Sequence, residues 1–300
     1  MSDGHPVFSR FPGYSGEALE DCQADFVGTQ THRKCLPGEF RPGATMQGGP
    51  ARDEEYFEWI DILESVVAAR DRYTMIEIGA GYGRWACRAA LAAKAMNIPA
   101  VHVAAVEAEP LHLEWLDEHF RRNGLSEAEF RIYPFAVAAK PGKTMFMINK
   151  PGESPEEMAR QWYGQSLATK KAVLKPVKSP DYCGRRVFTL QSGYQAVQVD
   201  VERFDTVLKD YDVIDLLDFD IQGFELEVIQ SCIDEIEQKA KRVHIGTHGV
   251  DLEAGLRELF SSRGWRCNFD FQCQQTNETP FGRIAFNDGV QSWTNPRFAA

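Results

Sequence analysis

The chain has 300 residues, 43% of them hydrophobic and 26% charged, a balance that is ordinary for a soluble globular protein with a sizeable core. Its 44 Asp and Glu residues exceed its 33 Lys and Arg residues, and the formal charge of −11 disfavours a general nucleic-acid binder because it repels phosphate backbones. No stretch approaches the ~18 consecutive apolar residues of a membrane span, and the N-terminus lacks the basic start and apolar run of a signal peptide, so we expect a cytoplasmic protein.

The first 52 residues are rich in glycine, proline and polar residues and show little sustained periodicity. This composition predicts an irregular N-terminal arm or lid over residues 1–52. Its frequent aromatic residues indicate that it can pack onto the rest of the protein. Residues 53–300 are expected to form one larger domain, which begins with a helix because apolar residues recur there at helical spacing.

Strand and helix signals alternate in the next part of the chain. The predicted elements are strand 73–79, helix 83–96, strand 101–107, helix 110–123 and strand 129–135. This alternation predicts an α/β fold, a parallel sheet covered by helices. A short β-like pair around 143–148 is then followed by an insertion over residues 149–195, and such insertions commonly shape a substrate entrance.

The alternating pattern resumes after the insertion. The predicted elements are strand 197–201, helix 202–210, strand 213–221, helix 224–239, strand 242–247, helix 252–263 and strands near 265–271 and 282–287. Because no helix separates the last two strands, we expect them to form an antiparallel hairpin at one edge of the sheet.

A glycine-rich turn follows the first predicted strand of the domain. Its pattern is Glu77-x-Gly79-x-Gly81-x-Gly83, with Ala80 between the first two glycines. Glycine lacks the Cβ atom that would keep a ligand away from the backbone. Glu107 ends the next predicted strand, where a carboxylate can accept hydrogen bonds from both hydroxyls of a ribose. Together these features predict a site for a nucleotide-like cofactor.

The spacing of the glycines discriminates between cofactors. A dinucleotide fingerprint, G-x-G-x-x-G, requires its third glycine at position 84, which is Arg84, and no GK[ST] sequence of a phosphate-binding loop follows. An NAD-dependent oxidoreductase or epimerase therefore stays only as an alternative. The observed pattern, with an acid after the second strand, resembles the S-adenosyl-L-methionine site of class I methyltransferases.

Further segments resemble the FkbM family of S-adenosylmethionine-dependent methyltransferases over roughly residues 53–290. The most specific are the E-x-x-P that begins at Glu107, the Asn123-Gly124-Leu125 turn and the motif Asp220-Ile221-Gln222-Gly223-x-Glu225. The resemblance implies a Rossmann-like class I methyltransferase fold over residues 53–300, a mostly parallel seven-stranded sheet with helices on both faces and an antiparallel edge hairpin. The chain departs from the family at Gln222, where an acid is usual, and at Asp218, where a lysine is common.

The resemblance also implies roles for individual residues. Those implied to line the methionine and ribose of the cofactor are Glu77, Gly79, Ala80, Gly81, Gly83 and Glu107. Those implied to lie near the adenine are Ala108, Phe135 and Ala136. The family mostly methylates hydroxyl groups, so the resemblance implies O-methylation of a sugar or secondary metabolite.

Methyl transfer from a sulfonium is a displacement in which the cofactor supplies the electrophile, so the protein must position the acceptor oxygen and take up its proton. Asp220 ends a central strand and could be the base, a holder of the hydroxyl, a metal ligand or a helix cap. His248 ends the next strand and could accept a proton or only hydrogen-bond in its turn. A divalent metal is possible at Asp220 and His248, with Asp200, but no spacing requires one. His244, on the same strand face as His248, is interpreted as core.

The acceptor site is less defined by the sequence. The candidate substrate residues are Trp162, Gln165, Ser166, Gln222 and Glu225. The three in the insertion could form an acceptor wall or pack the loop down. A small-molecule or sugar acceptor is expected, and a catalytically silent cofactor-binding protein of the same fold stays as an alternative because of Gln222 and Asp218. The sequence does not determine the oligomeric state.

Overall fold

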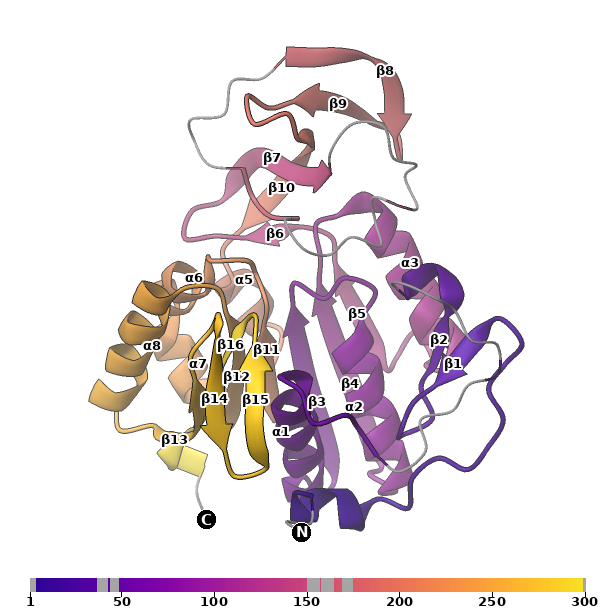
Figure 1. The fold of residues 1–300 in the computed structure, drawn as a ribbon, viewed down its shortest axis with the longest axis vertical. Helices are drawn as coiled ribbons and strands as arrows, with labels where there is room; N and C mark the ends of the chain where they lie inside the picture. Colours follow the sequence, from indigo (N-terminus) through magenta and orange to yellow (C-terminus); the bar gives the residue numbers. More distant parts are fainter. Residues whose placement is uncertain are drawn as a thin grey trace.

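The computed structural model describes residues 4–36, 43, 49–149, 157, 165–168 and 175–298. Its central sheet has seven strands in the order β13-β16-β12-β11-β3-β4-β5 (Figure 1). Their bounds are β3 (Arg72–Ile78), β4 (Ala100–Val106), β5 (Phe130–Tyr133), β11 (Leu216–Phe219), β12 (Arg242–Thr247), β13 (Arg266–Phe271) and β16 (Gly289–Thr294). β16 runs antiparallel to β12 and β13, and the other neighbours pair in parallel. The predicted mostly parallel seven-stranded sheet is confirmed.

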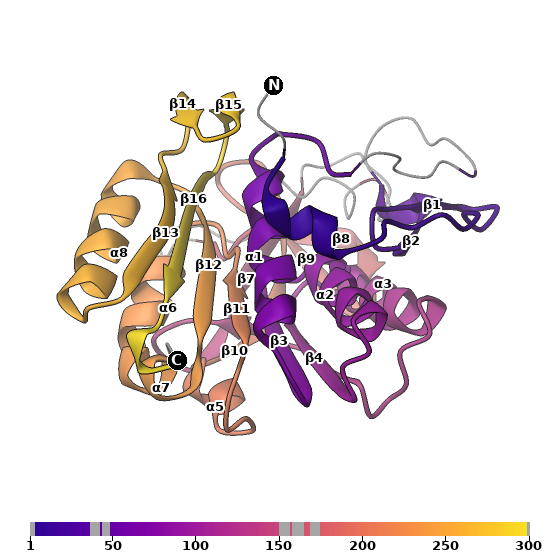
Figure 2. The same ribbon diagram turned by 90° about the horizontal axis from the view of Figure 1, so that it is seen from below.

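Helices cover both faces of this sheet (Figure 2). One face carries α1 (Glu55–Ala68), α2 (Arg84–Ala95) and α3 (Pro110–Arg122), and the other carries α5 (Asp205–Leu208), α6 (Glu225–Ser231), α7 (Ile233–Lys239) and α8 (Val250–Ser262). The strands are apolar on both sides: Met75 packs with the first group of helices and Ile76 with the second. This two-sided burial is why their sequences read as nearly continuous apolar runs. Within the described ranges, every helix is too short or too polar to cross a lipid bilayer.

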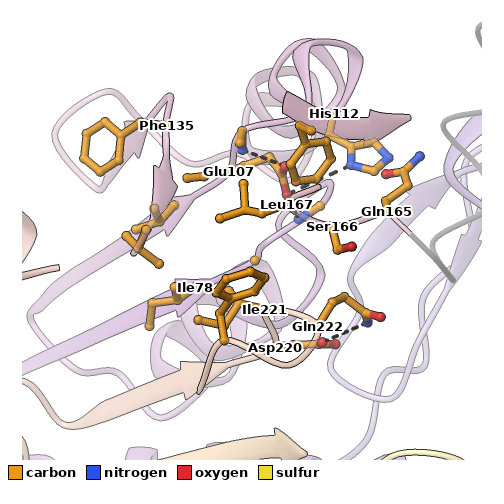
Figure 3. Close-up of a pocket in the computed structure, with 18 residues that line it drawn as sticks. Ile78, Glu107, His112, Phe135, Gln165, Ser166, Leu167, Asp220, Ile221 and Gln222 are labelled. Atoms are coloured by element: carbon orange, nitrogen blue, oxygen red, sulfur yellow. Dashed lines mark hydrogen bonds and ion pairs between the residues drawn. The ribbon is translucent and has the colours of Figure 1, made fainter. Parts of the chain in front are cut away.

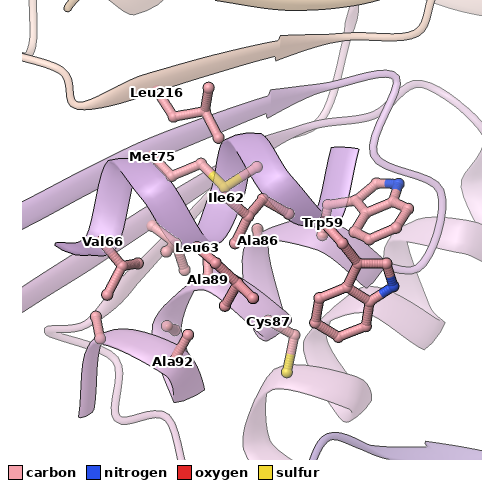
Figure 4. Packing of buried hydrophobic residues seen from close by; sticks show 14 of the residues in the cluster. Trp59, Ile62, Leu63, Val66, Met75, Ala86, Cys87, Ala89, Ala92 and Leu216 are labelled. Atoms are coloured by element: carbon pink, nitrogen blue, oxygen red, sulfur yellow. The ribbon is translucent and has the colours of Figure 1, made fainter. Parts of the chain in front are cut away.

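The core between α1, α2 and the sheet depends on small side chains. Ala86 and Ala89 of α2 are fully buried beneath Leu63 and Val66 of α1, with Met75 of β3 alongside (Figure 4). Alanine lets two helix backbones approach closely while keeping a high helix propensity. This packing holds the amino end of α2, which follows the glycine turn, against the sheet.

A second, smaller sheet lies above the carboxyl ends of the central strands (Figure 1). It contains β6 (Ala136–Val137), β7 (Gly142–Asn149), β8 (Lys175–Tyr182), β9 (Arg185–Thr189) and β10 (Gln195–Glu202). The prediction that strand 197–201 resumes the central sheet is wrong, because β10 pairs with β6, β7 and β9 instead. Its inward residues, such as Val197 and Val199, are buried in the cluster of this second sheet. The sheet thus uses residues on both sides of the predicted 149–195 insertion.

The C-terminal strands also differ from the prediction. The strand expected near 282–287 is β15 (Gly282–Phe286), which pairs with β14 (Gln275–Thr279) in a separate hairpin. The partner of β13 in the central sheet is β16, which carries Gln291 and Ser292 fully buried. Because these buried residues are polar, β16 lacks the apolar pattern by which a strand is predicted. The expected helix over 224–239 is divided into α6 and α7 at Cys232, whose φ of −142° is not helical.

The described part of the N-terminal arm packs on the first face of the domain. It contains η1 (Pro6–Arg10), β1 (Cys22–Ala24), β2 (Gln30–His32) and η2 (Arg33–Cys35), while η3 (Pro296–Phe298) lies at the other end of the chain. A buried ion pair joins Asp25 of the arm to Arg88 of α2 at 2.7 Å, and both side chains are 7% exposed. The Arg88 guanidinium also lies over the rings of Trp59 and Trp85, at 4.4 and 4.3 Å from their centroids. The arm is therefore anchored beside the amino end of α2.

His119 of α3 predicts a pH dependence of stability. Its side chain is buried edge-on to Tyr82, and burial together with the charges of Arg88 and Arg122 lowers its pKa to about 3. The unfolded chain takes up a proton near pH 6.5 while the folded protein stays neutral there, so stability falls as the pH drops from about 6.5 toward 3. This one group should cost about 2 kcal/mol between pH 7.5 and pH 5.

Urea unfolding at a series of pH values measures this effect. The control is His119→Phe, which keeps an aromatic ring beside Tyr82 but does not titrate. Other groups titrate equally in both proteins, so the difference in unfolding free energy between them should change by about 2 kcal/mol over this range. A difference that does not vary with pH would contradict the assignment.

Candidate active site

A cleft opens at the carboxyl ends of β3, β4 and β11, under the second sheet. It has two adjoining parts that share four wall residues, which are Ile78, Gly79, Asp220 and Gln222. The small pocket, about 110 Å³, has Glu107 and Leu167 on one side and Ile78 and Ile221 on the other (Figure 3). The large pocket, about 690 Å³, lies between the glycine turn, α1 and the N-terminal arm.

The glycine turn is shaped by its contact with the Asp220 loop. Gly79 has a φ of +83°, and a Cβ atom there would lie 1.8 Å from the carbonyl oxygen of Asp220. Only glycine allows this approach, which holds Asp220 at the junction of the two pockets. Glu77 caps α2 by accepting hydrogen bonds from the backbone of Trp85 at 3.2 Å and Ala86 at 2.8 Å. Gly79 of the predicted motif therefore forms part of the wall that the two pockets share.

Glu107 stands where β4 ends, in the wall of the small pocket. Its Oε1 accepts from the backbone N–H groups of Ala108 and Glu109 at 2.7 Å each, and its Oε2 accepts from Gly81 at 2.6 Å. Burial raises its pKa, and the electrostatic interaction with His112 and the hydrogen bonds from Glu109 and Gly81 oppose the rise. A carboxylate has about four acceptor positions, so this side chain is oriented by the protein and keeps capacity for a ligand hydroxyl.

His112 lines the same pocket and is absent from the residues that the sequence predicted. It lies in the first turn of α3, is 2% exposed, and places Nδ1 4.0 Å from Oε2 of Glu107. Its position five residues after Glu107, on the helix that starts at Pro110, is the signal that could have identified it.

Four more of the predicted cofactor residues line the small pocket, namely Gly81, Ala108, Phe135 and Ala136. Ala80 lines only the large pocket, and Gly83 lines neither. The cover comes from residues 165–168, which pair with β7: the N–H of Met147 donates to Ser166 at 2.8 Å and that of Ala168 to Met145 at 2.7 Å. Gln165 and Ser166, predicted to contact the acceptor, thus lie against the small pocket, and Trp162 lies outside the described residues.

Asp220 and His248 lie side by side, as their positions at the ends of neighbouring strands suggested. Nε2 of His248 is 3.3 Å from Oδ1 of Asp220, and its Nδ1 is 2.8 Å from Oε1 of Glu225. Glu225 is fully buried and also accepts from the backbone of Ile221 and Gly223. Glu225 therefore organises the loop and orients the imidazole.

This arrangement sets the charge of both groups. Burial alone would lower the pKa of His248, but the hydrogen bond to Glu225 and the charge of Asp220 raise it to about 9, so the ring is protonated at neutral pH. Desolvation raises the pKa of Asp220 to about 7, and His248 opposes that rise. Because 57% of the Asp220 side chain is exposed in the open cleft, we expect the full rise only when a ligand covers it. The amide nitrogen of Gln222 lies 2.8 Å from Nε2 of His248. Because both nitrogens of a protonated ring are donors, we expect this amide to turn its oxygen toward the ring.

Two other candidate residues have different surroundings. Asp200, considered as an extra metal ligand, is 58% exposed on β10 and pairs with Lys143 at 3.0 Å, so the structure does not bring it to Asp220. His244, interpreted as core, is 2% exposed but lines the large pocket with Asp218.

Comparisons with known proteins identify the family of this chain. The family model described as the methyltransferase FkbM domain matches residues 77–267. The chain belongs to the FkbM methyltransferase family. A protein of Jannaschia sp. (strain CCS1), provisionally named a methyltransferase, is 28% identical over 242 residues, which are 80% of this chain and 78% of that protein.

Two solved structures show more distant similarity. Methyltransferase FkbM from Methylobacillus flagellatus KT is 12% identical, with a TM-score of 0.44 over 81% of this chain and 55% of that one. The precorrin 8w decarboxylase of Methanobacterium thermoautotrophicum is 12% identical, with a TM-score of 0.40 over 82% of this chain and 91% of that one. In this FkbM-family chain, the family match includes Glu77, Glu107, Asp220 and His248 and every residue that lines the small pocket, whereas the lining of the large pocket extends beyond the match at both ends.

Proposed function

We propose that this protein transfers the methyl group of S-adenosyl-L-methionine to a hydroxyl group of a sugar or another small metabolite. The residues of the cleft fit the cofactor. Glu107 offers the ribose an oriented, buried carboxylate, and Ala108 and Phe135 offer the adenine apolar walls. The glycine turn leaves its backbone accessible to the methionine part of the cofactor. When bound, the cofactor supplies the electrophilic methyl group.

The observation that carries the proposal is the position of Asp220. It is a strand-end carboxylate, exposed to the cleft, in the wall of both pockets. An acceptor hydroxyl must lie between the cofactor and a group that can take its proton. We assign that role to Asp220, while the protonated imidazole of His248 stabilises the carboxylate form and does not act as the base.

The acceptor is proposed to be a small polar molecule. Gln222 presents an amide to the shared wall, and Gln165 and Ser166 add polar groups on the covering side. The large pocket is lined by many more carboxylates than arginines, and its two arginines, Arg84 and Arg88, are paired with carboxylates, so the lining disfavours a polyanion such as nucleic acid.

The test combines cofactor binding and turnover. We expect calorimetry to detect S-adenosylhomocysteine binding, and radiolabelled S-adenosylmethionine to transfer label to at least one member of a panel of sugars and hydroxylated metabolites. Absence of S-adenosylhomocysteine binding, or binding of NADH seen by its fluorescence, would overturn the proposal. Cofactor binding without transfer to any acceptor would favour the catalytically silent alternative.

A further inference from the structure

Three side chains of the large pocket converge from three different elements. Asp218 on β11 and His244 on β12 are register partners and lie on the face covered by α1, from which Glu58 reaches them. One oxygen of each carboxylate and one ring nitrogen of His244 all lie within 4.8 Å of one another. The three residues also line the large pocket, so the cluster is open to the cleft.

Asp218 carries an unsatisfied atom in this cluster. Its side chain is 2% exposed, and its Oδ1 finds no hydrogen-bond donor among the residues that the structure describes. The carboxyl of Glu58 is close enough to share a proton with Asp218. A buried carboxylate that faces a second carboxylate needs a proton or a cation between them, because like charges in low dielectric repel strongly.

His244 is oriented as metal-binding histidines usually are. Its Nδ1 hydrogen-bonds to Asp61 at 2.7 Å, and Asp61 is itself held by Arg242 at 2.5 Å and Ser292 at 2.8 Å. A carboxylate on one ring nitrogen fixes the ring and leaves the other nitrogen, Nε2, to donate its lone pair. The packing of α1 against β12 thus supplies both a ligand, Glu58, and the residue that orients the histidine.

We propose that Glu58, Asp218 and His244 bind a divalent transition-metal ion in the large pocket, with Nε2 of His244 as the nitrogen ligand. Two carboxylates and an imidazole suit Mn²⁺, Fe²⁺ or Zn²⁺ better than Ca²⁺ or Mg²⁺, which prefer oxygen ligands alone. Three protein ligands leave coordination positions open toward the pocket. The site differs from Asp220, Glu225 and His248, a second cluster of similar dimensions in which both ring nitrogens are already in contact with carboxylates.

Binding of Mn²⁺ alone to the full chain tests this site without methyl transfer. We expect electron paramagnetic resonance titration to show one bound ion per chain, and spin-echo modulation of that ion to show the ¹⁴N of an imidazole. Glu58→Gln and Asp218→Asn should each weaken binding by at least about tenfold, since loss of even an outer partner of a metal ligand costs about 10- to 100-fold. The ¹⁴N signal should disappear in His244→Ala.

The matched control is His248→Ala, which alters the second cluster and should leave Mn²⁺ affinity unchanged. Near-ultraviolet circular dichroism establishes that each variant is folded. If Asp218→Asn does not fold because the residue is buried, Glu58→Gln, at a partly exposed residue, still tests whether this cluster binds Mn²⁺. Absence of Mn²⁺ binding at millimolar concentration, unchanged affinity in Glu58→Gln, or loss of binding in His248→Ala would each overturn the proposal, whatever the result for methyl transfer.

Discussion

Replacement of Asp220 by asparagine is expected to lower the rate of methyl transfer by about 10²- to 10⁴-fold, the usual contribution of a positioned general base. Asparagine keeps the size of the side chain and can still hydrogen-bond an acceptor hydroxyl, but it cannot take up the proton. The affinity for S-adenosylhomocysteine should change little, because the proposed ribose contact is made by Glu107. Initial rates with radiolabelled S-adenosylmethionine, together with calorimetry, measure both quantities.

The control for this experiment is Asp200→Asn. Asp200 is also a strand carboxylate, but it pairs with Lys143 on the surface of the second sheet and should leave the rate unchanged. An unchanged rate in Asp220→Asn would exclude Asp220 as the base. A parallel loss of rate and of S-adenosylhomocysteine affinity would instead indicate that Asp220 positions the cofactor.

Replacement of Glu107 by glutamine is expected to weaken S-adenosylhomocysteine binding by about 10- to 100-fold. The variant loses the charged acceptor of the ribose hydroxyls, and hydrogen bonds to charged groups contribute about 1.5–3 kcal/mol each. Its amide would also turn a donor toward backbone N–H groups that the carboxylate now satisfies. Isothermal titration calorimetry measures the change.

Glu118→Gln is the matched control, because Glu118 lies on the outer side of α3 with a half-exposed side chain paired to Lys34. It should bind S-adenosylhomocysteine as the unmodified protein does. Thermal unfolding of both variants separates loss of the ribose contact from loss of folding. If a folded Glu107→Gln protein binds with unchanged affinity, the assignment of the ribose site is wrong.

The elements between Asp53 and Phe135 could be predicted because their signals are local. β3 and β4 are buried on both faces, and their apolar runs end at Gly79 and Glu107, which mark the boundaries. The second sheet was not predicted, although β10 alternates buried valines with the exposed Gln198 and Asp200, which indicates a sheet with one open face. That alternation does not identify the partner strands. Whether it pairs with β7 or with a central strand depends on contacts between distant residues.

The candidate site, like the fold, could be predicted from the sequence only in part. By itself the sequence determined which residues stand at strand ends, and hence that Glu107, Asp220 and His248 gather at one edge of a parallel sheet. Only the tertiary structure decided the charge of these groups and which residues surround them. Glu225 stabilises the protonated imidazole of His248, and α1 brings Glu58 and Asp61 to Asp218 and His244. The physical reason is that strand periodicity depends on residues adjacent in the sequence. The electrostatic field at a buried group instead depends on every element that packs against that group.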